Sequence, residues 1–210
     1  MKLRQLEMEL QRCRGFEKPR VSMEQYQTPA PLAARLLYDA FLKGDIEGKS
    51  IVDLGCGTGI LSIGAALLGA RTVTAIDADN DAIRIARKNA ELFGVDITFV
   101  IVDLKNTPSI NSLKTDIGPC DTVIMNPPFG AQKQNVHADR AFIDHALELA
   151  PITYGIFNLG STEFISKYIE KRGTITDRIS GVISLKHSFA HHTREVQDIS
   201  VEILRLERKQ

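Results

Sequence analysis

The chain has 210 residues, of which 43% are hydrophobic and 25% are charged, values typical of one globular domain rather than of a disordered or disulfide-rich chain. Its 26 basic and 26 acidic residues give a formal net charge of zero, so any contact with nucleic acid must be a local patch. The three cysteines are scattered and form no C-x-x-C pair, which predicts neither disulfides nor a metal site and favours the reducing cytoplasm.

The first element expected in chain order is a helix that Pro31 begins in its first turn and Gly44 ends. Residues 1–29 precede it as a segment that wraps the domain or forms a short helix of its own. Residues 30–210 would then form one α/β core. The longest apolar run in that core, residues 60–70, is about half the length of a membrane-spanning helix, so we expect no membrane segment.

From Ser50 onward, short β-branched runs alternate with amphipathic helical stretches, as they do in βαβ units. Between the strands we expect a helix from about Gly59, a helix over residues 79–93, a polar loop over residues 105–119 and a helix after Asp139. The predicted fold is a Rossmann-like α/β domain whose seven-stranded, mostly parallel sheet carries helices on both faces. The predicted strands are residues 51–54, 72–77, 97–102, 122–125, 152–158, 179–185 and 199–206.

A glycine-rich loop joins the first predicted strand to the helix behind it. Asp53 is followed by Gly55, Gly57 and Gly59, at the place where a doubly wound sheet meets a nucleotide-bearing cofactor. A dinucleotide-binding fingerprint would need a glycine at position 60, where this chain has Ile60. The spacing D-x-G-x-G-x-G instead resembles motif I of the class I methyltransferases that use S-adenosylmethionine. That resemblance implies that the loop backbone and Asp53 hold the carboxylate and ammonium groups of the cofactor.

Two further acidic residues stand at strand ends where the same cofactor would need them. Asp77 ends the second predicted strand, about 20 residues after Gly57, and can accept hydrogen bonds from both ribose hydroxyls. Asp103 closes the third predicted strand, and the resemblance implies that it binds the adenine amino group while the Leu104 amide contacts the ring. A turn or helix cap is the alternative role for either aspartate.

The tetrad Asn126, Pro127, Pro128 and Phe129 follows the fourth predicted strand, beside the switch point where a methyl donor would lie. An exocyclic amino nitrogen is a poor nucleophile because its lone pair is conjugated into the ring. The Asn126 side-chain carbonyl and the Pro127 backbone carbonyl can accept its two hydrogens and aim the lone pair at the methyl group. Phe129 offers a face on which a flipped base can stack. A simple structural turn is the alternative interpretation.

Several further segments make the resemblance more specific. They read FEKPR at 16–20, EQYQTP at 24–29, AARLLY at 33–38, DLGCGTGILSIGAALLGA at 53–70 and DTVIMNPPFGAQ at 121–132. Together they resemble the archaeal and eukaryotic methyltransferases that make N6-methyladenosine in small-subunit ribosomal RNA. The resemblance implies that Gln25 and Thr28 fold over the cofactor and that Gly55, Thr58 and Ile60 contact it.

Other functions stay open at this point. Protein glutamine N5 methylation also uses an N-P-P loop, because a carboxamide nitrogen has the same conjugation, although that family usually has tyrosine where this chain has Phe129. Guanine N2 methylation of ribosomal RNA and a non-enzymatic role as a cofactor-binding ribosome assembly factor are further alternatives. A cysteine nucleophile is not expected, since Cys56 lies inside the cofactor loop and Cys120 precedes the fourth strand.

Local basic patches that could contact RNA phosphates are expected in two places. One patch follows the N-P-P-F tetrad, and the other precedes the last predicted strand. The residues of the first patch are Lys133, His137 and Arg140, and those of the second are Lys186, His187, His191, His192 and Arg194.

The third predicted strand, from Ile97 to Val102, should lie at the edge of the sheet, because the first half of a doubly wound sheet runs in the order three, two, one. Its interior carries no charge, and an unprotected apolar edge tends to recruit another strand. The family resemblance implies a small zinc-binding activator protein as the partner. A local loop folded over this edge, such as residues 105–119, is the alternative.

Overall fold

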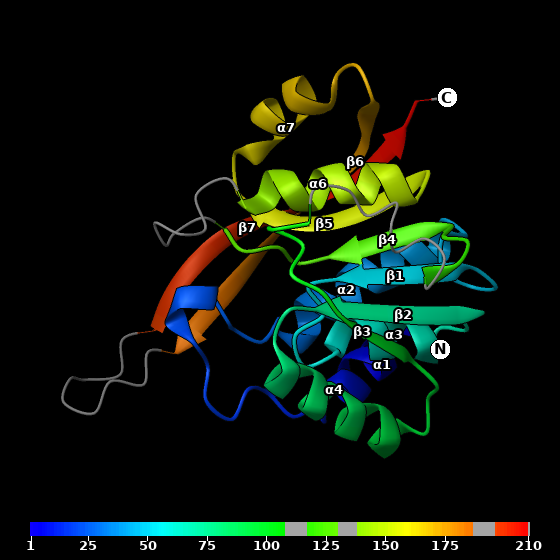
Figure 1. Ribbon diagram of the computed structural model, residues 1–210, viewed down its shortest axis with the longest axis vertical. Helices are drawn as coiled ribbons and strands as arrows, with labels where there is room; N and C mark the ends of the chain where they lie inside the picture. The colour runs from blue at the N-terminus through cyan, green and yellow to red at the C-terminus, as the bar shows by residue number, and fades with distance from the viewer. Residues whose placement is uncertain (108–116, 130–137, 187–195, 210) are drawn as a thin grey trace.

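The computed structural model describes residues 1–107, 117–129, 138–186 and 196–209. Its strands are β1 (Ser50–Leu54), β2 (Thr72–Asp77), β3 (Thr98–Ile101), β4 (Thr122–Met125), β5 (Ile152–Asn158), β6 (Gly173–Lys186) and β7 (Val196–Arg208). They form one seven-stranded sheet in the order β3-β2-β1-β4-β5-β7-β6 (Figure 1). The strands from β3 to β5 in this order run parallel, whereas β7 pairs antiparallel with both β5 and β6.

Helices cover both faces of the sheet, as predicted (Figure 1). One face carries α1 (Leu3–Leu10), α2 (Ala30–Leu42), α3 (Ile60–Leu67) and α4 (Asn80–Phe93). The other face carries α6 (Ala138–Leu149) and α7 (Ser161–Ile169). A short 3-10 helix, η1 (Val21–Met23), lies in the connection between α1 and α2. The leading segment therefore forms a short helix of its own, which was one of its two expected forms.

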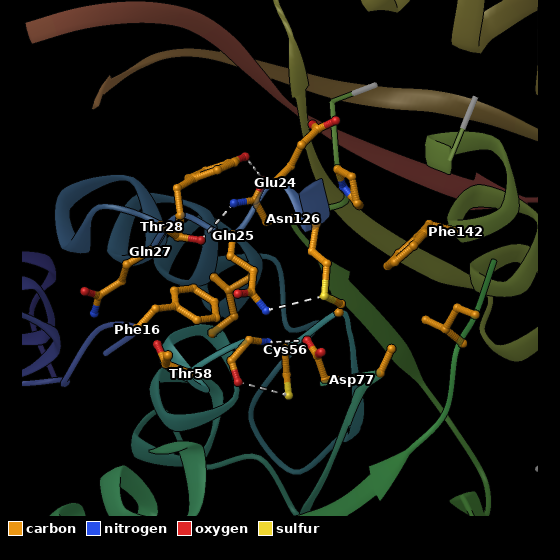
Figure 2. A pocket seen from close by; sticks show the side chains of 18 of the residues that line it. Phe16, Glu24, Gln25, Gln27, Thr28, Cys56, Thr58, Asp77, Asn126 and Phe142 are labelled. Atoms are coloured by element: carbon orange, nitrogen blue, oxygen red, sulfur yellow. Dashed lines mark hydrogen bonds between the residues drawn. The ribbon is translucent and has the colours of Figure 1, made fainter. Parts of the chain in front are cut away.

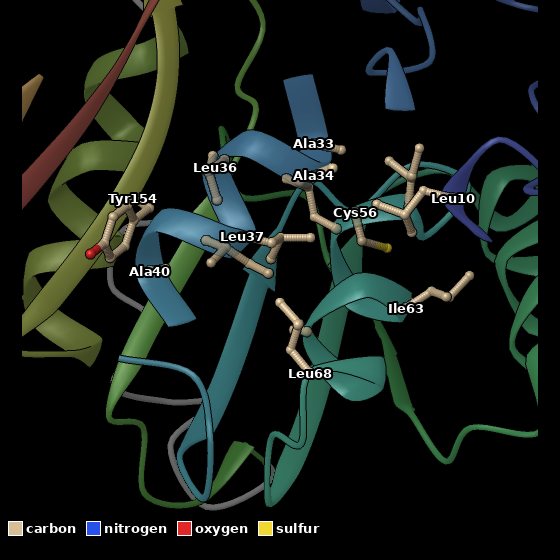
Figure 3. Close-up of a cluster of buried hydrophobic side chains, with 14 of the residues drawn as sticks. Leu10, Ala33, Ala34, Leu36, Leu37, Ala40, Cys56, Ile63, Leu68 and Tyr154 are labelled. Carbon is tan, nitrogen blue, oxygen red and sulfur yellow. The ribbon is translucent and has the colours of Figure 1, made fainter. Parts of the chain in front are cut away.

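The core consists of two apolar layers because successive strand residues point to opposite faces of a sheet that is buried on both sides. Ile51 packs into the layer under α1 to α4, and the next residue, Val52, packs into the layer under α6 and α7. In the first layer, Leu10, Leu37 and Ile63 bring α1, α2 and α3 together (Figure 3). This packing holds the start of α3 against the end of β1, where the glycine loop lies.

A buried polar network lies toward the amino ends of β4 and β5. Asp45 Oδ2 accepts hydrogen bonds from the Tyr154 hydroxyl at 2.7 Å and from Arg205 Nε at 2.9 Å. The Asp45 carbonyl accepts a hydrogen bond from Thr122 Oγ1 at 2.7 Å. Tyr154 has no exposed surface, and the Arg205 guanidinium lies over its ring. We call these four residues the Asp45 network.

The observed elements follow the predicted ones closely in the parallel half and less closely beyond it. β2, β4 and β5 have the predicted bounds, and β3 ends the described sheet on one side, as expected for an edge strand. β6 and β7 are longer than predicted because they pair with each other as the two arms of one hairpin. α7 was not predicted. The Thr162 amide in its first turn donates to Glu202 Oε1 at 2.7 Å, a partner 40 residues away that no local pattern reveals.

No helix in the described ranges is long and apolar enough to cross a membrane. Among the same described residues, no three His, Cys, Asp or Glu side chains gather in a way that could hold a metal ion.

Candidate active site

A cavity lies at the carboxyl ends of β1, β2 and β4 (Figure 2). One of its walls comes from residues 11–29, the connection between α1 and α2, which we call the strap. The strap residues that line the cavity are Phe16, Met23, Glu24, Gln25, Tyr26, Gln27 and Thr28. The lining residues from the rest of the molecule are Gly55, Cys56, Gly57, Thr58, Ile60, Leu61, Asp77, Ala78, Val102, Asp103, Leu104, Lys105, Asn126, Pro128 and Phe142.

Most of the residues that the sequence nominated for the site line this one cavity. The exceptions are Asp53, Gly59, Pro127 and Phe129, each of which lies within two positions of a lining residue but forms no part of the wall. The structure thus brings most of the nominated residues together around one cavity. Several of the contacts inside the site differ from the expected ones.

The glycine loop is held against the end of β2 by its own backbone amides. Gly55 N and Cys56 N both donate to the Ile76 carbonyl, at 2.8 and 2.9 Å. Gly57 N donates to Asp77 Oδ2 at 2.8 Å. These amides were expected to bind a cofactor carboxylate, but in this structure they are engaged with β2.

Two glycines of the loop let aromatic rings pack directly against its backbone. Gly55 and Gly57 have φ angles of +72° and +54°, a region that favours glycine. A Cβ atom on Gly55 would lie 2.8 Å from Phe142 Cε1, and one on Gly57 would lie 3.0 Å from Phe16 Cζ. The absence of side chains at these positions therefore lets the Phe142 and Phe16 rings, which Figure 2 shows on opposite sides of the site, lie close against the loop backbone.

Asp53 has no exposed surface and fastens β1 to α3. Its Oδ2 accepts hydrogen bonds from the Ser62 amide at 3.0 Å and from the Ser62 hydroxyl. Its Oδ1 has no hydrogen-bond partner among the described residues. Burial raises the pKa of Asp53 to about 7. The unpartnered oxygen is a group that an ammonium ion or an ordered water would satisfy.

Asp77 lines the cavity and organises the loops on either side of it. Its Oδ2 accepts from Gly57 N and its Oδ1 accepts from Asp79 N, each at 2.8 Å. Burial raises its pKa, and the amide hydrogen bonds oppose that rise. A carboxylate oxygen can accept two hydrogen bonds, so Asp77 keeps the capacity to bind hydroxyl groups.

Asp103 and Leu104 form a turn after β3 that borders the cavity. Asp103 Oδ1 accepts from the Lys105 amide at 3.0 Å and its Oδ2 accepts from Asn106 Nδ2 at 2.7 Å. The turn-capping role that was the alternative for Asp103 is therefore present. The buried His145 on α6 donates from Nε2 to the Leu104 carbonyl at 2.9 Å. His145, which the sequence did not single out, holds this turn in place.

The strap is anchored on the first turn of α4. Asp79 caps that helix by accepting from the Asp81 amide at 3.0 Å, and its Oδ2 also accepts from Gln25 Nε2 at 2.6 Å. Gln25 Oε1 accepts from the Arg20 amide at 2.9 Å. The Arg20 guanidinium lies 3.6 Å from Asp79 Oδ1 and 3.1 Å from Asp81 Oδ2. The Gln25 amide thus ties the strap to Asp79 through its nitrogen and to the strap's own Arg20 through its oxygen.

Asn89 makes a second anchor that the sequence interpretation missed. Its Oδ1 accepts from the Arg14 amide at 3.0 Å. Its Nδ2 donates to the Arg14 carbonyl at 3.0 Å and to the Thr58 carbonyl at 2.9 Å. Asn89 has no exposed surface and lies among the buried apolar residues of α4. A polar residue on the apolar face of an amphipathic helix was the signal that could have identified it.

The side chain of Asn126 is held by two hydroxyls of the strap. The Tyr26 hydroxyl donates to Asn126 Oδ1 at 3.1 Å, and Asn126 Nδ2 donates to Thr28 Oγ1 at 2.9 Å (Figure 2). The Tyr26 ring packs against the Phe129 ring with the centroids 5.6 Å apart. Thr28, which the family resemblance assigned to the cofactor, therefore also contacts the predicted acceptor-binding residue.

The cysteines do not supply a nucleophile to this site. Burial raises the pKa of Cys56 well above its usual range and that of Cys120 to about 12. Both thiols therefore stay protonated, as expected for small apolar fillers.

The expected RNA-contacting patches fall largely outside the described residues. Lys133 and His137 lie outside them, as do His187, His191, His192 and Arg194. Arg140 is described, and its guanidinium lies over the Phe164 ring at 5.0 Å from the centroid.

Residues 35–126 match the family model described as Ribosomal protein L11 methyltransferase (PrmA). MJ0284 of Methanocaldococcus jannaschii is 38% identical over 99% of this chain and 95% of its own length. The rRNA N(6)-adenosine-methyltransferase METTL5 of Danio rerio is 36% identical over 98% of both chains. The chain belongs to the METTL5-like family. The crystal structure of PH1948 from Pyrococcus horikoshii, at 35% identity, superposes with a TM-score of 0.86 over 100% of this chain and 99% of that one.

Proposed function

We propose that this chain is an S-adenosylmethionine-dependent methyltransferase that methylates N6 of an adenosine in small-subunit ribosomal RNA. The observation that carries the proposal is that Asn126 and Pro128 line the same cavity as the glycine loop and Asp77. A site for a nucleoside-bearing donor and a group that can bind an amino nitrogen therefore share one cavity. The relatives named rRNA N(6)-adenosine-methyltransferase, which match this chain over nearly their whole length, support adenosine as the acceptor.

The residues around the cavity fit S-adenosylmethionine, which supplies a methyl group activated by a positively charged sulfur. Asp77 would accept hydrogen bonds from the ribose hydroxyls. The Asp103 and Leu104 turn would contact the adenine ring. The rest of the molecule would lie against Gly55 and Gly57, which line the cavity together with Phe16 and Phe142.

The remaining nominated residues enclose the donor. Thr58 and Ile60 would contact it from the glycine loop and α3, and Gln25 and Thr28 would cover it from the strap. Asp53 lies behind the glycine loop. Its unpartnered Oδ1 would accept a hydrogen bond from the ammonium group of the cofactor, directly or through a water.

The chemistry at the acceptor follows from the N-P-P-F tetrad. The carbonyls of the Asn126 side chain and of Pro127 accept the two amino hydrogens, which favours a tetrahedral nitrogen with its lone pair out of conjugation. That lone pair forms the new N–C bond as the S–C bond breaks and its electron pair stays on sulfur. The nitrogen then loses its extra proton to water, so no strong base is required. Phe129 stacks on the flipped base.

Nucleoside analysis tests this proposal. The protein is incubated with methyl-labelled S-adenosylmethionine and either small-subunit ribosomal RNA or a total protein extract, and Asn126→Ala serves as the matched control. We expect label in N6-methyladenosine with the wild-type protein and none with the variant. Label in 2-methylguanosine or in glutamine would assign one of the alternative acceptors, and no label at all would favour an assembly factor.

We further propose that a strand of a small zinc-binding activator protein pairs with β3, as the family resemblance implies. Two observations support this. β3 ends the described sheet, and Ile101 within it is 52% exposed although apolar. Such an edge is stabilised by an added strand.

Ile101→Lys tests this partner at an exposed position. Phe99, the other candidate on the strand, lies under the Arg87 guanidinium at 4.9 Å and packs against the core, so its replacement would disturb the fold. The matched control is Val182→Lys, because Val182 is 54% exposed on β6 at the opposite end of the sheet. We expect Ile101→Lys alone to abolish co-purification with the activator. Equal binding by both folded variants would reject β3 as the interface.

A further inference from the structure

The strap places a tyrosine hydroxyl on the residue that binds the methyl acceptor. Tyr26 and Asn126 are 100 residues apart in the sequence, yet the Tyr26 hydroxyl donates to Asn126 Oδ1 at 3.1 Å. The same tyrosine packs its ring against Phe129, the last residue of the tetrad. Tyr26 therefore touches both side chains that the proposed reaction uses to hold the target base.

The orientation of Asn126 matters because an amide side chain has one accepting end and one donating end. The terminal torsion of asparagine is broad and roughly two-fold, so a free amide samples many orientations. If Nδ2 faced the target amino group, two donors would meet and the nitrogen lone pair would not be freed. Only an amide held with Oδ1 toward the acceptor supports the proposed chemistry.

The strap fixes both ends of this amide. Nδ2 is committed to Thr28 Oγ1 at 2.9 Å, and Oδ1 receives the Tyr26 proton. A carbonyl oxygen has two lone pairs, so Oδ1 can hold the Tyr26 hydroxyl and still accept a hydrogen from the target amino group. The half-buried phenol remains a donor, because its partial desolvation raises the pKa of Tyr26 above its usual range.

The strap also borders the cofactor side of the cavity. Its next residue toward the amino terminus, Gln25, is bonded to Asp79 Oδ2 at 2.6 Å, and Asp79 donates its amide to Asp77. One short segment therefore links the ribose-binding carboxylate to the acceptor-binding amide. Alignment of Asn126 therefore depends on the position of the strap.

We propose that Tyr26 is a positioning residue for methyl transfer, which orients the Asn126 amide through its hydroxyl and supports Phe129 through its ring. This rests on the proposed function of the cavity. It adds a role for a residue of the E-Q-Y-Q-T segment that the family resemblance left without one. Tyr26 acts through Asn126 and does not itself exchange a proton with the substrate.

The test variant is Tyr26→Phe, which keeps the ring against Phe129 and removes the hydroxyl. Its matched control is Tyr154→Phe, which removes a buried hydroxyl from the Asp45 network, away from the cavity. We expect Tyr26→Phe to lower kcat about tenfold, the effect of one lost hydrogen bond. The KM for RNA and the Kd for S-adenosylmethionine should stay within about twofold. Tyr154→Phe should leave kcat unchanged.

A double-mutant comparison separates positioning from a general structural effect. In the Asn126→Ala background, Tyr26→Phe should cause no further loss, because the group it orients is gone. NMR of the Asn126 side-chain amide, assigned by its absence in Asn126→Ala, should show one ordered pair of signals in the wild-type protein and exchange-broadened signals in Tyr26→Phe. This readout needs no activity.

The outcomes distinguish this inference from the proposed function. Full kcat in folded Tyr26→Phe, or a raised Kd for S-adenosylmethionine with unchanged kcat, would overturn the positioning role while leaving the reaction in place. If the wild-type protein labels guanine or glutamine, the proposed acceptor is wrong. The positioning role is then measured on that acceptor, because its amino or amide nitrogen needs the same oriented carbonyl. If no acceptor is labelled, unchanged Asn126 amide signals in Tyr26→Phe would reject the inference.

Discussion

The Asp45 network, near the amino ends of the parallel strands, and the cavity at their carboxyl ends differ in how their polar groups are paired. Toward the amino ends, Asp45 Oδ2 is paired with both Tyr154 and Arg205, and the Asp45 carbonyl is paired with Thr122. At the carboxyl ends, Asp53 Oδ1 has no partner among the described residues, and Asp77 faces a cavity. The first set of groups is internally satisfied, and the second has capacity left for a ligand.

The source of the partners also differs. In the Asp45 network, all three partners of Asp45 belong to strands, which the sheet itself holds in register. At the cavity, the partners of Asn126 are Tyr26 and Thr28, which belong to the strap. The hydrogen bonds of Asp45 join strands and therefore stabilise the fold. The hydrogen bonds of Asn126 join the end of β4 to the strap, which forms one wall of the cavity. We therefore expect substitutions at the cavity to change turnover or cofactor affinity, and substitutions in the Asp45 network to change the free energy of unfolding.

The largest expected effect is on turnover in Asn126→Ala. Loss of one preorganised acceptor should lower kcat about a hundredfold or more, since such groups contribute on the order of 3 kcal/mol to the transition state. Affinity for S-adenosylmethionine should fall little, because Asn126 is assigned to the amino group of the target. Single-turnover kinetics beside a cofactor titration measures both quantities. Near-normal turnover in Asn126→Ala would contradict the role of Asn126 in binding the target amino group.

The next effect is on cofactor affinity in Asp77→Ala. Removing the carboxylate that we propose binds the ribose should weaken binding of S-adenosylmethionine roughly tenfold to a hundredfold, as expected for lost hydrogen bonds to a charged group. Asp121→Ala is the matched control. Asp121 immediately precedes β4, at the amino ends of the strands, and accepts a hydrogen bond from the Ser50 amide. Isothermal titration should show a changed Kd for Asp77→Ala alone. Equal Kd values for S-adenosylmethionine in the two variants would show that Asp77 does not contact the cofactor.

The pH dependence of stability tests the buried carboxylate of Asp53. Its folded pKa of about 7 lies above the usual aspartate value near 4, so the folded protein binds the proton more tightly than the unfolded chain does. The free energy of unfolding should therefore fall as pH rises from about 4 to about 7 and level off above that range. Asp53→Asn cannot ionise and should lack this part of the slope. Denaturant titrations measure the free energy of unfolding of the wild-type protein and of Asp53→Asn across this pH range. The same pH dependence in both proteins would show that the Asp53 carboxylate does not titrate as described.

The smallest expected effect is on stability in Tyr154→Phe. Loss of its hydrogen bond to Asp45 should lower the free energy of unfolding by about 1 kcal/mol, because Asp45 keeps Arg205 as a partner. Methyl-transfer kcat should not change. Thermal unfolding and the turnover assay, run on the same preparation, check both parts. Lost activity in a variant of normal stability would mean that the Asp45 network does more than stabilise the sheet.

The sequence predicted the parallel half of the fold and the location of the cavity because both depend on local patterns. β-branched runs fixed β2, β4 and β5, and the glycine spacing placed a cofactor loop after β1. Chain topology then brought Asp77 and Asn126 to the same edge. These inferences needed no knowledge of contacts between distant residues.

The contacts that the sequence missed are those between distant segments. Asn89 bonds to Arg14 across 75 residues, and Tyr26 bonds to Asn126 across 100. α7 was not predicted for the same reason, because the Thr162 amide in its first turn donates a hydrogen bond to Glu202 of β7. Such pairs depend on how the strap and the last hairpin return to the sheet, which local propensity and spacing do not encode.

A crystal structure of the protein with S-adenosylhomocysteine and adenosine would test the central claim most directly. The account predicts that the adenosine amino nitrogen lies about 3 Å from both Asn126 Oδ1 and the Pro127 carbonyl oxygen, with the Tyr26 hydroxyl still bonded to Asn126. An amino group bound elsewhere in the cavity, or an Asn126 amide that presents Nδ2 to the base, would contradict it.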